Sequence, residues 1–388
     1  MQKRILTIAF IFIFCISNAQ TSSIVFEAGK EGYASYRIPS IIRLPNHTLI
    51  AFAEGRLNGA ADFGHIQIVM KKSIDQGKTW SALKVVASYE KWQAGNAAPV
   101  VDLLDPLYPK GKIILFYNTG NVKEMELRQG KGIREVWMIQ SIDGGETWSP
   151  SVNITNQVHY PNGQMDGRVY KNEQDWRTYA NTPGHATQCL EGKYKGRIFV
   201  AANHSVGPAQ VHFKDYVSHG YYSDDHGKTF SISSSLNLAG SNEATAAFIS
   251  KDRLILNARN QQGNIKSRIV AYSNNGGGFF DRAYYDTQLI DPVCEAAILN
   301  IGKKRNKSIL AFVNASDTLY RNNLTLKISF DEGLTWPISK LIDATENEHW
   351  MQQDYTAYSD LVKMGKRKVG IVYECQGYSK ILFKLVRW

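Results

Sequence analysis

An eight-residue pattern, S-x-D-x-G-x-T-[W/F], recurs along the chain and constrains its fold more than any other feature. Four complete copies begin at residues 73, 141, 223 and 329, and a decayed copy with Asn in place of the Asp begins at residue 273. The Asp carboxylate can accept backbone N–H bonds within its own turn, and the Gly supplies a backbone angle that other residues resist. Four such copies are far beyond chance, so the chain is built from repeated hairpin units.

The segments between the copies have the pattern of short strands, rich in β-branched and aromatic residues and bounded by Gly, Asn, Asp or Pro. Strands are predicted at 48–53, 65–71, 112–117, 135–141, 197–202, 253–258, 268–273, 308–313, 324–330, 368–373 and 380–386. No long stretch has convincing helical periodicity. Repeats that each hold about four short strands predict an all-β fold, a six-bladed β-propeller of four-stranded antiparallel blades.

The N-terminus holds the one apolar run that is long enough to matter for a membrane. Two basic residues precede the run 5–16, and Ser17-Asn18-Ala19 then offers small residues for cleavage. The run is too short to span a bilayer, so residues 1–19 are predicted to be a secretory signal peptide. A single propeller domain is expected over 20–388, in the periplasm or secreted, without stable membrane insertion.

Composition disfavours several classes of protein. Four Cys among 388 residues exclude a disulfide scaffold. Cys189, Cys294 and Cys375 would remain after cleavage and are interpreted as buried small side chains, because no metal-ligand spacing joins them. The formal net charge is +10, but no block of five Lys or Arg exists, so nucleic acid is not the expected partner. The nine His show no metal spacing, so neither a catalytic metal nor another cofactor is expected.

A second motif, Tyr36-Arg37-Ile38-Pro39, precedes the first repeat. With this segment and its repeats, which match the Asp-box, the chain resembles a bacterial sialidase over essentially all of the predicted mature sequence. The resemblance implies a retaining exo-α-sialidase that hydrolyses terminal α-ketosidically linked sialic acid through a tyrosyl covalent intermediate. The implied partners are sialylated glycans on glycoproteins, glycolipids or oligosaccharides, and the protein is expected to be a monomer.

Binding of sialic acid requires cations, because its anomeric carbon carries a carboxylate that guanidinium groups hold in a planar fork. The resemblance implies three arginines from three blades. They are Arg37 in Arg-Ile-Pro, Arg259 in Leu-Asn-Ala-Arg-Asn, and Arg321, which lies eight residues before the fourth Asp-box. Glu374 lies on a late apolar strand, where an unpaired carboxylate would be costly. It matches the glutamate that orients the first arginine.

The family's nucleophile is a tyrosine, which as a neutral phenol avoids charge repulsion with an anionic substrate. A phenol with a pKa near 10 needs a base. Tyr358 in Thr-Ala-Tyr-Ser-Asp-Leu matches the nucleophile, with Tyr355 as its competitor, and Glu243 matches the base. Asp62, in a loop of small residues, is the expected general acid/base.

Two further substrate contacts are implied by the resemblance. Arg56 would bind the substrate carboxylate or its O4 hydroxyl, and Asp102 would meet the same hydroxyl, with Asp105 close by as an alternative. The segment 165–185 is expected as a loop over the site. Candidates for an N-acetyl pocket, among which the sequence does not choose, are Trp92, Met125, Trp137, Met165 and Trp176.

Two alternatives remain. A non-catalytic Asp-box propeller that binds glycans would be expected to have lost the Tyr/Glu/Asp set, whereas this sequence keeps every member. A trans-sialidase variant of the same fold would use the same core residues and differ only where the acceptor binds. The sequence therefore favours an enzyme but leaves its acceptor and its linkage preference open.

Overall fold

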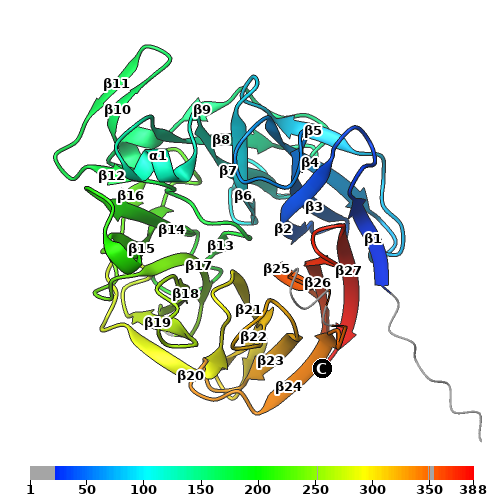
Figure 1. Ribbon diagram of the computed structural model, residues 1–388. Helices are drawn as coiled ribbons and strands as arrows, with labels where there is room; N and C mark the ends of the chain where they lie inside the picture. Colours follow the sequence, from blue (N-terminus) through cyan, green and yellow to red (C-terminus); the bar gives the residue numbers. More distant parts are fainter. Residues whose placement is uncertain (1–21, 251, 348, 350–353) are drawn as a thin grey trace, which may run out of the picture.

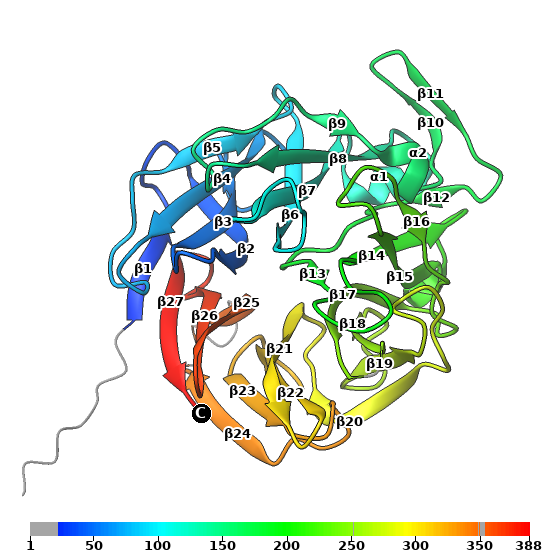
Figure 2. The same cartoon turned by 180° about the vertical axis from the view of Figure 1, so that it is seen from behind.

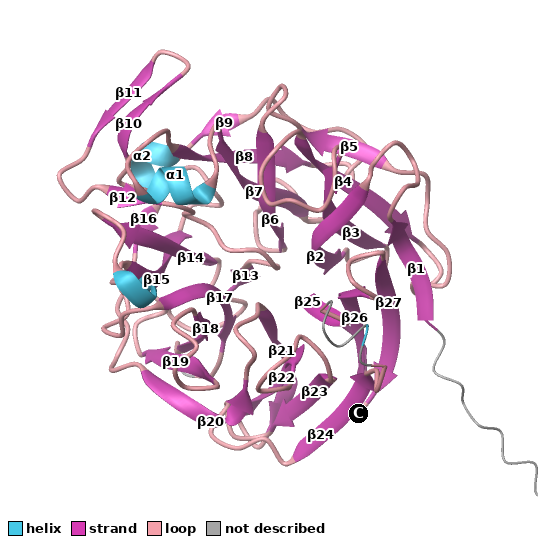
Figure 3. Ribbon diagram, viewed as in Figure 1, coloured by secondary structure: helices cyan, strands magenta, loops and turns pink. Residues whose placement is uncertain are grey.

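The computed structural model describes residues 22–250, 252–347, 349 and 354–388. These residues lie almost wholly in strands and loops (Figure 3). The helical elements with defined bounds are α1 (Glu124–Arg128), α2 (Thr155–Val158) and the single 3-10 turn η1 (Val211–Phe213). The all-β prediction is confirmed. The predicted signal peptide, 1–19, lies outside the described residues.

The strands form antiparallel sheets that stand around a common centre, which is the arrangement of a β-propeller (Figures 1 and 2). One sheet runs in the order β1 (Ser22–Glu27), β27 (Lys380–Arg387), β26 (Lys368–Cys375) and β25 (Thr356–Gly365). A second sheet contains β17 (Ser241–Phe248), β18 (Leu254–Asn260), β19 (Ser267–Ser273) and β20 (Tyr284–Ile290). Another contains β21 (Ala296–Lys304), β22 (Lys307–Ala315), β23 (Leu324–Ser329) and β24 (Ile338–Asp343).

Two larger sheets complete the ring. The first contains β2 (Ser35–Arg43), β3 (Leu49–Arg56), β4 (Ile66–Ser73), β5 (Lys84–Ala87), β6 (Gln93–Asp102), β7 (Lys112–Gly120), β8 (Arg134–Ser141) and β9 (Val152–Asn153). The second contains β12 (Trp176–Arg177), β13 (Thr187–Gln188), β14 (Ile198–Val206), β15 (Tyr216–Ser223) and β16 (Ser231–Ile232). A separate hairpin, β10 (Asn162–Met165) and β11 (Arg168–Lys171), projects from the outer edge (Figure 1).

The ring is closed by the first and last described strands. β1 pairs antiparallel with β27, with Ser22 opposite Lys384 and Glu27 opposite Lys380. Phe26 on β1 is fully buried and stacks on Tyr36 of β2, with ring centroids 5.1 Å apart. Segments more than 350 residues apart in the sequence therefore share one sheet.

The segments predicted as strands coincide with observed strands, most of them the middle strands of a sheet. The segment 112–117 falls in β7, and 368–373 falls in β26. Every residue of β7 is buried, because both faces of a sheet pack against neighbouring sheets. That environment selects the continuous apolar sequence that made these strands predictable.

The repeated octapeptides form the predicted hairpins and each connects a middle strand to the outer strand that follows it, as β4 to β5 and β23 to β24. In the first copy, Gly77 N–H donates to Ser73 Oγ (2.8 Å), and Asp75 accepts from both the N–H (3.0 Å) and the hydroxyl (2.6 Å) of Thr79. Gly77 has a φ of 84°, and a Cβ there would lie 2.1 Å from the ring of Phe383. The turn therefore requires glycine for both its angle and its space.

In most copies the aromatic residue that ends the octapeptide packs on a strand of the preceding repeat, whereas Trp336 of the last copy meets Phe312 of its own sheet. Trp148 meets Phe52 with ring centroids 6.2 Å apart, and Phe230 meets Phe116 at 5.7 Å. Such edge-to-face pairs contribute about 1 kcal/mol beyond the buried area. The octapeptide thus joins neighbouring repeats as well as turning the chain.

The three described cysteines, Cys189, Cys294 and Cys375, are free and buried, as predicted. Among the described residues, no helix has the length and apolar character that crossing a membrane would require.

Candidate active site

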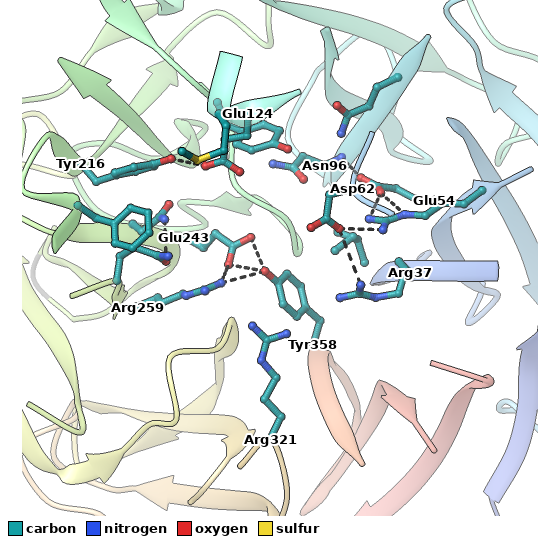
Figure 4. A pocket seen from close by; sticks show the side chains of 18 of the residues that line it. Arg37, Glu54, Asp62, Asn96, Glu124, Tyr216, Glu243, Arg259, Arg321 and Tyr358 are labelled. Atoms are coloured by element: carbon teal, nitrogen blue, oxygen red, sulfur yellow. Dashed lines mark hydrogen bonds and ion pairs between the residues drawn. The ribbon is translucent and has the colours of Figure 1, made fainter. Parts of the chain in front are cut away.

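The strands of each sheet that face the common centre, such as β2, β6, β17 and β25, are called inner strands below. A cavity of about 370 Å³ lies where these inner strands meet (Figure 4). Most of the predicted site residues line it. These are Arg37, Arg56, Asp62, Glu243, Arg259, Arg321 and Tyr358. They come from several different sheets, so only the closed ring brings them together.

The inner strands are irregular where they line this cavity. A bulge inserts an extra residue, bends the strand and re-aims its side chains. Shifts in strand register occur in β2 between Arg37 and Ser40, in β6 between Gly95 and Ala98, in β17 between Ser241 and Ala244, and in β25 between Thr356 and Ser359. Glu243 and Tyr358 lie within two of these shifts.

Ile38 shows the strain that such a bulge can carry. Its φ is 57°, which is rare for a β-branched residue. Its N–H donates to Glu374 Oε1 (2.8 Å), so the buried carboxylate holds the backbone in this conformation. Local strain of this kind occurs most often at functional sites.

Tyr358 is hydrogen-bonded to a carboxylate at the centre of the cavity. Its hydroxyl lies 2.7 Å and 2.6 Å from the two carboxylate oxygens of Glu243. Arg259 Nη1 donates to Glu243 Oε2 (2.8 Å) and to the Tyr358 oxygen (3.1 Å). Burial and the Glu243 charge raise the pKa of Tyr358 well above 10, with Arg259 acting against them. The resting phenol is therefore neutral, and its hydroxyl donates a hydrogen bond to the Glu243 carboxylate.

Three guanidinium groups surround this pair. Figure 4 shows Arg37, Arg259 and Arg321 around the Tyr358 ring. The Cζ atoms of Arg37 and Arg321 lie 5.7 Å and 5.8 Å from the centroid of that ring. Burial acts to lower the pKa of Arg37, but the Glu374 carboxylate outweighs it and keeps the pKa raised. The cluster remains cationic and suits an anionic group of a ligand.

Glu374 joins the first arginine to the tyrosine strand. Its Oε1 accepts from Arg37 Nε (2.7 Å), and its Oε2 accepts from the backbone N–H of Tyr358 (3.2 Å). Its side chain is completely buried. The orienting role expected from the sequence is consistent with these contacts, which also fix the bulge of β25.

Asp62 lies at the mouth of the cavity in the loop between β3 and β4. Its side chain is 74% exposed and accepts from Arg56 Nη1 (2.8 Å), with Arg37 Nη1 at 3.8 Å. Desolvation acts to raise the pKa of Asp62, but the guanidinium groups of Arg56 and Arg37 outweigh it and lower the pKa. Asp62 is thus an accessible carboxylate whose proton affinity depends on the charge beside it.

The structure places Asp102 outside the cavity, which corrects the expectation that it meets a substrate hydroxyl. Asp102 ends β6, six residues after the cavity residue Asn96, and an extended strand covers roughly 20 Å over that distance. Its carboxylate is fully buried and is bound by Gln188 Nε2 (2.6 Å) and His226 Nδ1 (2.9 Å). The alternative, Asp105, does not line the cavity either and binds Lys112 Nζ (2.6 Å).

Asp102, Asp105 and His226 are close enough together to hold a metal ion. Lys112 Nζ lies 2.6 Å from Asp105 and 3.9 Å from Asp102, so an ammonium group already supplies the cation.

Sequence reasoning missed several residues of the cavity. Glu54 Oε2 accepts from Arg56 Nε (3.0 Å) and Nη2 (2.6 Å), and its other oxygen accepts from Asn96 N–H (2.9 Å). A signal for Glu54 existed, because residues two apart on a strand share a face. The Tyr378 ring lies 3.7 Å from Arg37 Cζ, yet Tyr378 sits in a turn where no pattern marked it.

One side of the cavity wall is formed by α1 and by segments near it. Glu124 and Met125 of α1 lie beside Phe213 and Tyr216, and the Tyr216 hydroxyl donates to Glu124. Of the candidates for an N-acetyl pocket, Met125 lines the cavity, whereas Trp92, Trp137, Met165 and Trp176 do not. Tyr179 also lines it, so the segment 165–185 reaches the site through this residue.

Comparisons with known proteins show what the whole chain is similar to. The chain is 28% identical over 367 residues to a sialidase of Micromonospora viridifaciens, covering 89% of this chain and 50% of that protein. It is 27% identical over 376 residues to a sialidase of Bacteroides fragilis, covering 90% of this chain and 62% of that protein. The solved structure of a Hadza microbial sialidase superposes with a TM-score of 0.75 at 24% identity, covering 94% of this chain and 68% of that one.

The chain therefore spans between half and two thirds of the length of these two curated relatives. The family model for the BNR repeat-like domain matches residues 47–372, which is most of the chain. The matched range begins before the first octapeptide and ends after the last, so it contains every copy of the repeat. The chain belongs to the BNR repeat-like domain family.

Proposed function

We propose that this chain is a retaining exo-α-sialidase that hydrolyses terminal sialic acid from glycoconjugates. The observation that carries the proposal is the contact of Tyr358 with Glu243 inside a cluster of three arginines. A phenol paired with a base suits covalent attack on a sugar whose own carboxylate occupies the arginines. The relatives named as sialidases support the same activity.

The finer architecture is part of this proposal. The eight-stranded sheet is joined between β4 and β6 by one parallel pair, Ile66 with Gln93, whereas its other neighbours pair antiparallel. We infer that the sheet is two adjacent blades and that the propeller has six. Residues 1–19 act as a cleaved signal peptide in this proposal, which would place a single domain, 20–388, in the periplasm or outside the cell.

Substrate binding begins with charge. The carboxylate of sialic acid is held by Arg37, Arg259 and Arg321, which relieves the repulsion among three clustered cations. Held there, the anomeric carbon lies next to the Tyr358 oxygen. Much of the catalytic effect then comes from fixed orientation, since reacting groups already stand in place.

The first chemical step forms the covalent intermediate. The Tyr358 oxygen bonds to the anomeric carbon and its proton passes to Glu243, while the glycosidic bond breaks and Asp62 protonates the leaving oxygen. The guanidinium of Arg259 touches both partners of the proton transfer and stabilises the negative charge that develops between them.

The second step reverses these roles. Asp62 takes a proton from water, the water oxygen bonds to the anomeric carbon, and Tyr358 leaves with the proton that Glu243 returns. Two displacements at one carbon retain its configuration. The bound substrate carboxylate also neutralises Arg37, which removes part of the charge that lowers the pKa of Asp62. Substrate binding therefore helps Asp62 to hold the proton that it must donate.

The test compares two tyrosines of the same strand region. Tyr358→Phe should abolish release of the fluorophore from an α-linked sialoside, whereas Tyr355→Phe should retain it. Tyr355 is the matched control because its hydroxyl contacts Asp343 (3.3 Å) and it does not line the cavity. Proton NMR of the first product should show the α-anomer before mutarotation.

Other outcomes would change the proposal. Turnover that survives in Tyr358→Phe would refute the nucleophile, and initial β-anomer would refute retention. Binding of sialosides by folded wild-type protein without turnover would favour a glycan-binding propeller. Sialic acid found mainly on an added acceptor sugar or closed on its own hydroxyl would favour a transferase.

A further inference from the structure

A second cavity, of about 430 Å³, lies at the other end of the inner strands. β2 passes the first cavity at Arg37 and reaches the second at Ile41, and β25 does the same at Tyr358 and Leu361. The two cavities therefore occupy opposite ends of the propeller centre. The volume of the second cavity is within the range of small-molecule sites, and the proposed catalysis makes no use of this cavity.

The wall of this cavity is mainly apolar. Aliphatic side chains from several inner strands line it, including those of Ile42, Val101, Leu299 and Val362. Leu103 and Leu190 belong to the same lining and are 42% and 54% exposed, so the apolar surface continues to the outside. A hydrocarbon chain would find contact along this wall.

The ionisable side chains of the wall are all basic. They belong to Arg43, His47, His185 and Lys363, and none of the described lining residues is an Asp or Glu. The carboxylate of Asp360 is fully buried behind the wall. It is already engaged by the backbone N–H groups of Ile41 (2.9 Å) and Leu361 (2.8 Å).

One ring nitrogen of His185 can form a further hydrogen bond. Its side chain is only 7% exposed, and its Nδ1 lies 2.6 Å from Asp360 Oδ1, which fixes the ring. Its Nε2 is buried without a hydrogen-bond partner among the described residues, and so is Nε of Arg43. Buried polar groups are nearly always satisfied, so each of these two atoms can take a further polar partner, which a water or a ligand atom can supply.

We propose that this second cavity binds an amphipathic organic carboxylate. Its chain would lie on the aliphatic wall, and its carboxylate would meet the basic groups that include Arg43 and His185. An amine of the same shape would be repelled, and a neutral apolar molecule would leave those groups unpaired. The site is distinct from the sialic acid pocket and does not depend on the proposed activity.

Calorimetric titration of the full chain with octanoate tests the proposal, with octanamide as the uncharged probe of the same length. Octanoate should bind, and octanamide should bind at least tenfold more weakly. Arg43→Gln and Lys363→Gln should each weaken octanoate at least threefold. Lys110→Gln, at an exposed lysine outside the cavity, should leave the affinity unchanged.

The arginines of the first cavity could also attract octanoate, so the test must separate the two sites. Arg321→Gln should leave octanoate affinity unchanged, whereas Leu299→Trp, which fills the second cavity, should abolish binding in protein with wild-type circular dichroism. Loss of binding in Arg321→Gln, equal affinity for octanamide, or no binding of octanoate to the wild type would each overturn the proposal.

Discussion

The inner and middle strands of the propeller differ in sequence, in the regularity of their register and in function. β7, a middle strand, contains the continuous apolar run 113–117, keeps an unbroken register to β8, and is buried throughout. β25, an inner strand, has the sequence TAYSDLVKMG and shifts its register at the point where Tyr358 turns into the cavity. The middle strands supply packing, while the irregularity of the inner strands supplies the positions that chemistry needs.

The largest effect should come from the inner strands and should spare stability. Tyr358→Phe removes one hydroxyl, and turnover of a sialoside should fall by roughly a thousandfold or more, because the proposed nucleophile is lost. Urea unfolding should change by about 1 kcal/mol or less, since packing of the ring is kept. A large loss of stability in this variant would contradict the view that middle strands supply packing while inner strands supply functional positions.

A middle strand should show the opposite result. Phe116 on β7 is fully buried and meets Phe230 and Tyr221, so Phe116→Ala should lower the free energy of unfolding by about 3–5 kcal/mol. Turnover per folded molecule should stay near the wild-type value. Phe279→Ala, at a side chain that is 60% exposed, serves as the control and should change little.

The part of the fold that could be predicted follows the same division. The middle strands were predictable because burial on both faces selects apolar runs, and the hairpins were predictable because their turn chemistry is local. The inner strands were not among the predicted segments. QAGNAAPVVD of β6 and SNEATAAF of β17 are small and polar, since they face the cavity as well as the sheet.

The site could be predicted where a motif carried it. Seven of the nine expected residues line the cavity, and Glu374 stands directly behind them. The prediction that Asp102 lines the cavity was wrong, because sequence position does not say which end of an inner strand faces the cavity. Tyr378 was missed because its contact with Arg37 is purely tertiary, with no local signal.

A third prediction concerns two buried histidines, one on the middle strand β15 and one directly after α2. His219 of β15 and His159 are fully buried, and burial lowers the pKa of each to about 3. The folded state therefore binds fewer protons than the unfolded state, whose histidines titrate near 6.5. Stability is fully present above that pH and falls as the pH is lowered toward the folded-state pKa.

The variant His219→Gln isolates this effect. Between pH 7 and pH 5 the free energy of unfolding of the wild type should fall by about 2 kcal/mol more than that of the variant. Urea unfolding at both pH values gives the comparison. His47→Gln, at an exposed histidine, should keep the wild-type slope. Parallel slopes for the wild type and His219→Gln would contradict the neutral state of His219.

The smallest effect should come from the octapeptide turns. The decayed copy keeps its geometry, because Asn275 Oδ1 still accepts from the N–H of Phe279 (2.8 Å). Asp331→Asn should therefore cost about 1 kcal/mol or less in urea unfolding. Gly333→Ala, at a φ of 92° with Ile255 2.9 Å from the new Cβ, should cost more. Equal losses would show that the carboxylate, not the backbone angle, decides the turn.

Closure of the ring through β1 and β27 has a consequence for how a nascent chain becomes active. Tyr358 and Glu374 belong to β25 and β26, while Arg37, which Glu374 holds, belongs to β2, more than 300 residues earlier. Ribosomes therefore deliver Arg37 long before its partner. Until β25 and β26 have been made, the first arginine is unpaired and the cavity lacks Tyr358, so the site can assemble only after these strands join the ring.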